Sequence, residues 1–274
     1  MVVIIVAIVV AFVILYLLAV MPRMVNRPDR SPFMGVLYAH RGLHDNEGDA
    51  PENSIKALEN AVEAGYGVEL DVQLSKDKIP VVFHDFTLKR VCGVEGKVSD
   101  YTYDQLQQFR LFHSKERIPS LEEFLKLVDG KVPLIVELKI EWTDASVCER
   151  VDELLRRYHG VYCIESFNPL GLIWYRKHRS DVMRGQLSDV FRKEEGLKGS
   201  LYFALEHLLL NFVTKPDFIA YNHKYHRMLS RQICKKLYRS VAVAWTIKTQ
   251  QQLDARRNDF DLFIFDSFIP ENEE

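Results

Sequence analysis

The sequence has little cysteine and no excess of charge of either sign. Its four cysteines, among 274 residues, are far apart and form no CxxC pair, which argues against a zinc cluster or a disulfide framework and fits free thiols in a reducing compartment. The formal net charge is −2, so there is no basic surplus to indicate a nucleic-acid partner. There is also no internal repeat or low-complexity tract. With 47% hydrophobic and 27% charged residues, the composition is typical of a globular protein with a large core.

One long hydrophobic run stands at the N-terminus. Residues 2–20 contain no charged side chain, and a helix of this length would be roughly 28 Å long, close to the hydrocarbon thickness of a bilayer. A cleaved signal peptide would have positive charge before the run and small residues after it, but only Met1 precedes it. We therefore predict a single-pass transmembrane anchor over 2–20. The arginines that follow favour a cytoplasmic catalytic part; they are Arg23, Arg27 and Arg30.

The segment 21–34 is rich in proline and poor in apolar residues, and we interpret it as a linker. From residue 35 to about 270, short apolar runs alternate with amphipathic stretches. The apolar runs are nearly continuous, which is typical of parallel strands that are buried on both faces. The predicted strands cover 36–40, 67–72, 80–83, 133–138, 161–165, 182–186, 217–221, 241–246 and 262–266. Helices are predicted at 54–64, 120–130, 144–158, 169–178, 201–212, 228–238 and 250–258.

Nine strands are one too many for a (β/α)8 barrel. The short connection between the second and third strands shows which of them lies outside the parallel barrel. A parallel crossover needs a dozen or more residues, whereas "KDK" at 76–78 leaves room only for a hairpin turn. We therefore expect 80–83 to return antiparallel to the second strand. The remaining eight strands, separated by helices, predict an α/β fold of the TIM-barrel type over 35–270. An open doubly wound sheet is the alternative.

Polar side chains follow several of these strands, where a barrel of this kind has its reactive groups. Glu69 and Asp71 lie two residues apart, hence on one face of the second strand, and Glu137 closes the run "PLIVEL". Three carboxylates would repel one another unless a cation neutralised them. Hard divalent ions prefer oxygen ligands. We therefore predict one divalent cation, Mg²⁺ or Ca²⁺, bound by these three residues.

Two histidines end neighbouring runs of this region. His40 closes the first strand and His84 closes the hairpin arm, so both should reach the rim that carries the carboxylates. A pair of imidazoles beside a metal suits general acid–base catalysis near neutral pH. Arg41 and Lys139 would add positive charge for phosphate oxygens. Together these groups predict phosphodiester cleavage.

Three further features each have two interpretations. Glu52 precedes the first helix of the barrel and could bind substrate or simply favour the helix N-terminus through its dipole. Trp245 could line the pocket or pack in the core. The segment 201–212, "LYFALEHLLLNF", could be an interfacial membrane helix or a helix that covers the barrel.

The motifs of this region resemble those of the glycerophosphodiester phosphodiesterase family. They are "AHRG", "PENS", "ELDVQLSKDKIPVVFHD", "IPSLEEFL", "ELK", "SFNP", "AWTI" and "FIFDSFIP", in this order from about Tyr38 to Pro270. The resemblance implies a TIM barrel that hydrolyses glycerophosphodiesters to sn-glycerol 3-phosphate and an alcohol with a divalent cation. His40 and His84 match the acid–base pair of the family. Glu69, Asp71 and Glu137 match the metal ligands of the family. Arg41, Glu52 and Lys139 match residues that surround its site.

The chain departs from the usual family pattern at the rim of the site. Phe86 follows Asp85 where a second acidic residue is common, Cys92 and Gly93 replace a Thr-rich turn, and the last strand ends in 266–268, Asp-Ser-Phe. These changes could alter which head group fits. The alternatives are a phospholipase D- or C-like enzyme that hydrolyses lysophospholipids at the membrane, and a barrel that serves only as a membrane-tethered binding module. We make no prediction of the oligomeric state.

Overall fold

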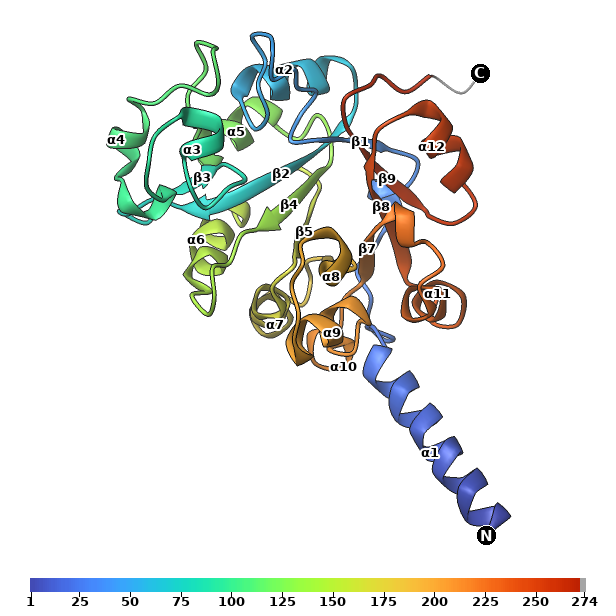
Figure 1. Cartoon of the computed structure of the whole chain (residues 1–274). Helices are drawn as coiled ribbons and strands as arrows, with labels where there is room; N and C mark the ends of the chain where they lie inside the picture. The colour runs from blue at the N-terminus through green and yellow to red at the C-terminus, as the bar shows by residue number, and fades with distance from the viewer. Residues whose placement is uncertain (272–274) are drawn as a thin grey trace.

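The structure, a computed structural model, describes residues 1–271. Eight parallel strands form a closed barrel, in the order β1-β9-β8-β7-β6-β5-β4-β2, and β1 pairs with β2 to complete the ring (Figure 1). The predicted (β/α)8 barrel is therefore confirmed and the open sheet is excluded. The strands are β1 (Leu37–His40), β2 (Gly67–Leu74), β4 (Leu134–Leu138), β5 (Tyr162–Ser166), β6 (Arg184–Ser188), β7 (Phe218–Asn222), β8 (Val241–Ile247) and β9 (Leu262–Phe265).

The remaining strand forms the predicted hairpin. β3 (Pro80–Val82) runs antiparallel to β2, with Val72 opposite Val82 and Leu74 opposite Pro80. The hairpin leads into a long excursion, residues 84–120, which carries α3 (Lys89–Cys92) and α4 (Tyr103–Leu106). This excursion has an apolar cluster of its own, which includes Val81, Leu88, Val98, Leu106 and Ile118. Its own core holds it to one side of the barrel, over β3 (Figure 1).

Helices cover the outside of the barrel, and four of the nine within residues 1–271, α2, α5, α7 and α12, begin at a side-chain cap that the sequence shows. Ser54 accepts a hydrogen bond from the Ala57 amide at the start of α2, and Ser120 forms a capping box with Glu123 at the start of α5. The covering helices are α2 (Ile55–Glu63), α5 (Leu121–Val128), α6 (Ser146–Leu155), α7 (Pro169–His178), α8 (Phe191–Glu194), α9 (Ser200–Glu206), α10 (Asn211–Thr214), α11 (Leu229–Lys236) and α12 (Gln250–Arg256).

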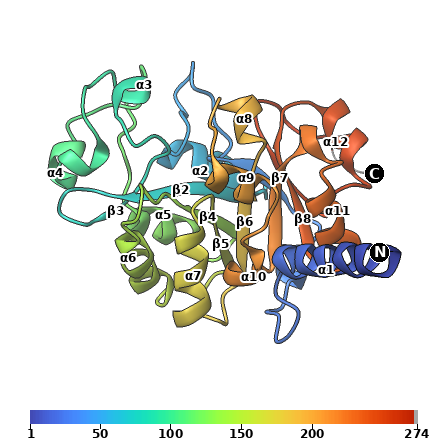
Figure 2. The same ribbon diagram turned by 60° about the horizontal axis from the view of Figure 1, so that its bottom comes forward.

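The prediction of one helix over 201–212 was wrong. α9 ends at Glu206 and α10 begins at Asn211, because Leu208 adopts a positive φ of 57° and is buried, 1% exposed, in the core around the barrel. The carbonyls that lose their helical hydrogen bonds at this break accept hydrogen bonds from side chains of the barrel instead. Ser188 Oγ donates to the Leu205 carbonyl at 2.9 Å and Tyr221 Oη to that of Glu206 at 2.9 Å. The two short helices still cover the barrel, α10 beside α7 and α9 next to α8 (Figure 2).

The N-terminal run forms the helix α1 (Val2–Val20), which projects from the barrel and is long and apolar enough to cross a membrane. Length and composition alone do not distinguish a membrane span from a signal sequence. Its C-terminal end rests beside α10 and α11 (Figure 2), where Tyr238 Oη donates to the Leu17 carbonyl at 2.9 Å and Asn211 to that of Val20 at 3.0 Å.

The segment 21–34, interpreted as a linker, lies against the barrel. Arg23 donates to the Ser180 carbonyl at 2.8 Å, and Arg27 to that of Tyr238 at 2.8 Å. Phe33 is buried, 4% exposed, among the residues that fill the barrel interior, and its carbonyl accepts a hydrogen bond from Tyr38. This segment therefore seals the barrel at the N-terminal ends of the strands, and leaves the opposite end for a site.

Candidate active site

Three buried carboxylates gather at the C-terminal ends of β2 and β4. Asp71 and Glu137 are direct partners in the register of these strands, and Glu69 lies on the same face of β2. Each of the three offers an oxygen within 4.8 Å of the others, and all three residues are buried. Within residues 1–271, Asp71 Oδ1 has no hydrogen-bond partner. An all-oxygen, acidic cluster with an unsatisfied buried oxygen fits a hard divalent cation.

The pKa values of these carboxylates shift in different directions because their neighbours differ. Burial, followed by the charges of Asp71 and Glu137, raises the pKa of Glu69 well above its usual range. Burial opposes ionisation of Asp71 too, but the positive charges around it outweigh burial and hold its pKa well below the usual range. Burial also raises the pKa of Glu137, although Lys139 counters this effect. A bound cation would favour the ionised form of all three.

Two cations from different strands border the cluster. Lys139 Nζ lies 2.9 Å from Glu137 and 3.5 Å from Asp71. Arg41 Nε lies 3.3 Å from Asp71, and the Arg41 amide donates to Glu69 at 3.1 Å. The turn after β1 makes this possible: Arg41 has a φ of 57°, and the Cβ of any residue in place of Gly42 would lie 2.8 Å from the Ala57 carbonyl carbon. The glycine of "HRG" is therefore required by the close approach of this turn to α2.

His40, the last residue of β1, lies between the carboxylates and the end of β9. Its Nε2 is 3.9 Å from Glu69, and its Nδ1 is 3.4 Å from Asp266, which directly follows β9. An ionised carboxylate can only accept, so the proton on this ring belongs on Nδ1 and the lone pair of Nε2 faces the site. Burial, and next the charge of Arg41, lower the pKa of His40 to about 4. The imidazole is therefore neutral at pH 7.

His84, delivered by the hairpin, has a similar partner on the other side. Its Nδ1 lies 2.6 Å from Asp85, so Nε2 is the nitrogen available for proton exchange. Arg90 from α3 holds Asp85 at 2.7 Å and Glu52 at 2.7 Å. Burial opposes ionisation of Glu52, but hydrogen bonds from Arg90 and the charge of Arg41 lower its pKa to about 2. Glu52 is thus oriented toward two arginines, 2.7 Å from Arg41, and links the turn after β1 to the excursion.

The opposite wall of the barrel mouth is aromatic. Trp245 of β8 packs edge-on against Phe167, with ring centroids 5.5 Å apart. Its indole Nε1 is buried, and in the part of the chain that the structure describes it has no hydrogen-bond partner. The Trp245 ring therefore packs on the barrel interior, which is one of its two predicted placements. Its contact with a substrate stays a prediction.

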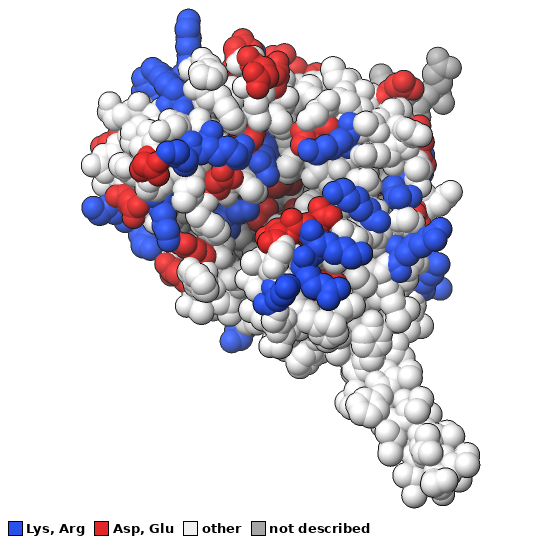
Figure 3. Space-filling view, in the orientation of Figure 1, with Lys and Arg blue, Asp and Glu red and all other residues white. Residues whose placement is uncertain are grey.

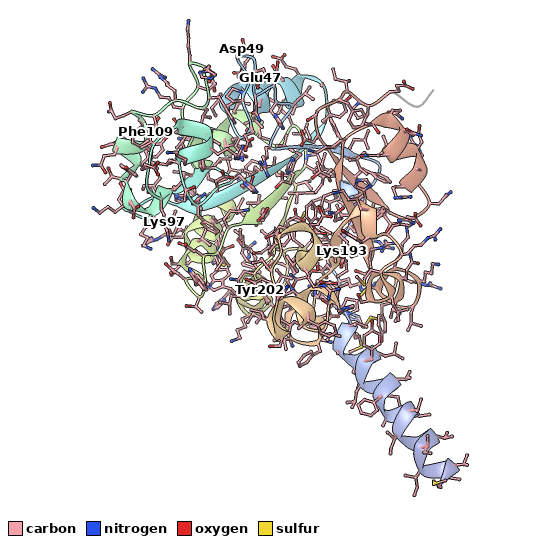
Figure 4. All side chains as sticks on the ribbon, in the orientation of Figure 1. Glu47, Asp49, Lys97, Phe109, Lys193 and Tyr202 are labelled. Carbon is pink, nitrogen blue, oxygen red and sulfur yellow. The ribbon has the colours of Figure 1, made fainter. Side chains whose placement is uncertain are left out.

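The mouth is a hollow at the centre of the ring of strands, with acidic side chains in its depth and basic ones around it (Figure 3). Lys97 of the excursion and Lys193 of α8 lie on opposite sides of this opening (Figure 4). Lys97 is paired with Glu141 at 2.6 Å, and Lys193 lies over the ring of Tyr225. A hollow with carboxylate side chains inside and basic side chains around it suits a small anionic molecule that is held through a metal ion.

The sequence did not point to every residue of this site. Asp85 and Asp266 stand in the motifs "VVFHD" and "FIFDSFIP" but were given no role, yet each lies on the Nδ1 of a histidine. Arg90 and Glu165 were not predicted at all. An acidic residue directly after an apolar strand, as Asp266 is after β9, is the signal that could have revealed it.

Comparison with known proteins decides the family. The profile of the glycerophosphoryl diester phosphodiesterase family matches residues 40–265. The chain belongs to this family. A glycerophosphodiester phosphodiesterase of Bacillus altitudinis is 38% identical over 115 residues, 39% of this chain and 46% of that protein. Human lysophospholipase D GDPD1 is 28% identical over 157 residues, 53% of this chain and 48% of that protein.

The solved structures of the family show the same fold. An Oleispira antarctica phosphodiesterase in complex with the product sn-glycerol-3-phosphate has a TM-score of 0.69 and 24% identity, and the similarity covers 85% of this chain and 93% of that one. The curated relatives are matched over shorter lengths, since the aligned segments span about half of the bacterial proteins.

Proposed function

We propose that this protein is a metal-dependent glycerophosphodiesterase, which hydrolyses a glycerophosphodiester to sn-glycerol 3-phosphate and an alcohol. The observation that carries the proposal is the position of the carboxylate cluster between two histidines whose Nδ1 atoms each face an aspartate. Family membership supports the substrate class. Glu69, Asp71 and Glu137 would hold a divalent cation, Mg²⁺ or Ca²⁺, which when bound neutralises charge on the phosphate oxygens.

In this proposal the two histidines act on opposite sides of the reacting phosphorus: one accepts a proton from the attacking group and the other donates a proton to the leaving group. His40 is neutral at pH 7, because burial lowers its pKa to about 4, so its Nε2 accepts a proton from the attacking water, whose oxygen bonds to phosphorus. His84 donates a proton to the oxygen of the departing alcohol. One P–O bond forms as the other breaks, and no net proton is taken up by the pair. Asp266 and Asp85 hold the two rings in the required orientation.

The remaining charged groups would bind the phosphate. Lys139 and Arg41 border the carboxylate cluster from two sides, and their positive charge stabilises the oxygens on which charge develops in the transition state. Trp245, with its available N–H, would contact the glycerol or alcohol part of the substrate. Glu52 would act by fixing Arg41, which it binds at 2.7 Å.

Replacing each histidine tests the assignment. His40→Gln and His84→Gln should each lower kcat for glycerol 3-phosphate release by about 10²- to 10⁴-fold. His159→Gln is the matched control, because His159 is exposed and precedes β5, at the end of the barrel away from the site. An unchanged kcat in either site variant, with the fold intact, would contradict the acid–base roles.

A lysophospholipid is the second candidate substrate, and one surface feature favours it. The side chains of Leu201, Phe203 and Phe212 on α9 and α10 are 57%, 58% and 52% exposed, and α10 lies beside the end of α1. Such side chains could insert into a bilayer interface. A human relative bears the name lysophospholipase D. Turnover of deacylated, water-soluble diesters and lysophospholipids by the same preparation distinguishes the candidates, since a strong preference for the soluble diesters excludes the second.

For the N-terminal helix we propose a single-pass membrane anchor with the barrel in the cytoplasm. The 19-residue apolar length of α1 and the arginines after it support this arrangement. A cysteine introduced at Val25, which is 73% exposed, should react with an impermeant maleimide only after the membrane is opened. Labelling in intact cells would contradict the orientation.

A further inference from the structure

A fourth buried carboxylate continues the row of metal-binding candidates across the barrel. Asp71, Glu137 and Glu165 are successive register partners on β2, β4 and β5. Neighbouring parallel strands lie about 4.8 Å apart, and residues in register point to the same face. Glu165 therefore points to the same interior as Glu137. It is 1% exposed.

Glu165 differs from its neighbours in having no positive partner. Lys139 lies between Glu137 and Asp71, whereas in residues 1–271 no cationic side chain lies within ion-pair distance of Glu165, and its Oε2 has no hydrogen-bond partner. A buried carboxylate left unpaired is costly to the fold. Burial, followed by the charges of Glu137 and Asp71, raises the pKa of Glu165 well above its usual range.

The neighbouring strand β6 offers Glu165 no polar side chain on its other side. Its partner on β6 is Gly185, and a Cβ there would lie 2.0 Å from the ring of Phe218. The Phe218 ring thus fills the space over Gly185 and is buried, 1% exposed. An apolar ring offers no hydrogen bond to a carboxylate, so the polar groups near Glu165 are those of the cluster, whose charges act on it.

The Glu165 carboxylate lies outside the cluster whose oxygens are within 4.8 Å of one another. We propose that Glu165 is a fourth carboxylate of the cation site, which binds the ion through one bound water beside Glu69, Asp71 and Glu137, and that it favours Ca²⁺ over Mg²⁺. This inference rests on the proposed metal-dependent function. Ca²⁺ accepts six to eight oxygen ligands in flexible geometry, whereas Mg²⁺ demands an octahedron and keeps several waters. An additional carboxylate therefore benefits Ca²⁺ more.

The charges around the site are consistent with this assignment. Four carboxylates face two fixed cations, Arg41 and Lys139. If all are ionised the site carries two net negative charges, which one divalent cation neutralises. Glu165, with no cation of its own, is the member of the row whose compensation depends most on the bound ion.

The test is direct cation binding by the full-length protein in detergent, measured by calorimetry with Ca²⁺ and Mg²⁺ separately. In Glu165→Gln the Kd for Ca²⁺ should rise about 10- to 100-fold, and the Kd for Mg²⁺ should rise less. Glu153→Gln is the matched control and should bind as wild type, since Glu153 is exposed on α6, where it pairs with Arg150. Glu165→Asp, which keeps the charge, should recover part of the Ca²⁺ affinity.

The outcomes separate this inference from the proposed function. Equal Ca²⁺ affinity in wild type and Glu165→Gln, with cation binding retained, would overturn the role of Glu165 alone. A wild-type protein that binds neither cation would overturn both the metal-dependent function and the fourth ligand. If Glu165→Gln does not fold, Glu165→Asp decides: wild-type Ca²⁺ affinity together with a wild-type Ca²⁺-to-Mg²⁺ ratio would contradict the inference, and a loss selective for Ca²⁺ would support it.

Discussion

The contact between Asp266 and His40 allows a sharp test of how the general base is held. Asp266→Asn keeps the size of the side chain but removes its charge, so the amide can present either an oxygen or an NH₂ group to Nδ1. The 3.4 Å separation is long for a hydrogen bond, which sets an upper limit on the effect. We expect kcat to fall about 10- to 100-fold, as for other residues that orient a reacting ligand. That loss equals about 1.4–2.7 kcal/mol of transition-state stabilisation.

The assay is steady-state release of glycerol 3-phosphate, with kcat and KM determined separately. Because Asp266 acts through His40 and not on the substrate, KM should change less than about twofold. Asp259→Asn is the matched control, since Asp259 also faces a histidine, His226 at 3.8 Å, but lies before β9, away from the site. Full kcat in Asp266→Asn, or an equal loss in Asp259→Asn, would refute the reasoning.

Two further predictions follow from burial. Because burial lowers the pKa of His40 to about 4, the neutral base persists in mild acid, and kcat/KM should lose its base-dependent part only as pH falls toward 4; a base-dependent limb near pH 6.5 would contradict the neutral buried imidazole. Phe33→Ala should lower the free energy of unfolding by about 3–5 kcal/mol, because Phe33 is 4% exposed and seals the barrel. The kcat of the folded variant should match wild type, and unchanged denaturant unfolding would show that this seal contributes nothing.

Much of the fold was accessible from the sequence because its signals are local. The hairpin followed from the short "KDK" connection, and β3 does pair antiparallel with β2. Helix starts followed from caps such as Ser54 and Ser120. The break between α9 and α10 was not predictable in this way, because it depends on Leu208 filling a place in the core, which no local pattern shows.

The residues of the candidate site likewise differ in how far the sequence predicts them. Glu69, Asp71 and Glu137 could be expected together, because they close neighbouring strands of a predicted barrel. The partner of His40 is less evident, since Asp266 is 226 positions away along the chain and meets it only when β9 closes onto β1; its position at the end of the last predicted strand is the signal for it. Glu165 also ends a predicted strand, 161–165, but a single carboxylate in "CIESF" resembles an ordinary rim residue.

The central claim is that the cation held by the carboxylate cluster is needed for cleavage of a glycerophosphodiester. Phosphorus-31 NMR of the purified full-length protein with glycerophosphocholine tests it most directly, because substrate and product phosphates give separate signals. The account predicts a growing glycerol 3-phosphate signal that stops with excess chelator and returns with Ca²⁺ or Mg²⁺. Formation of the same product at the same rate in chelator would contradict it.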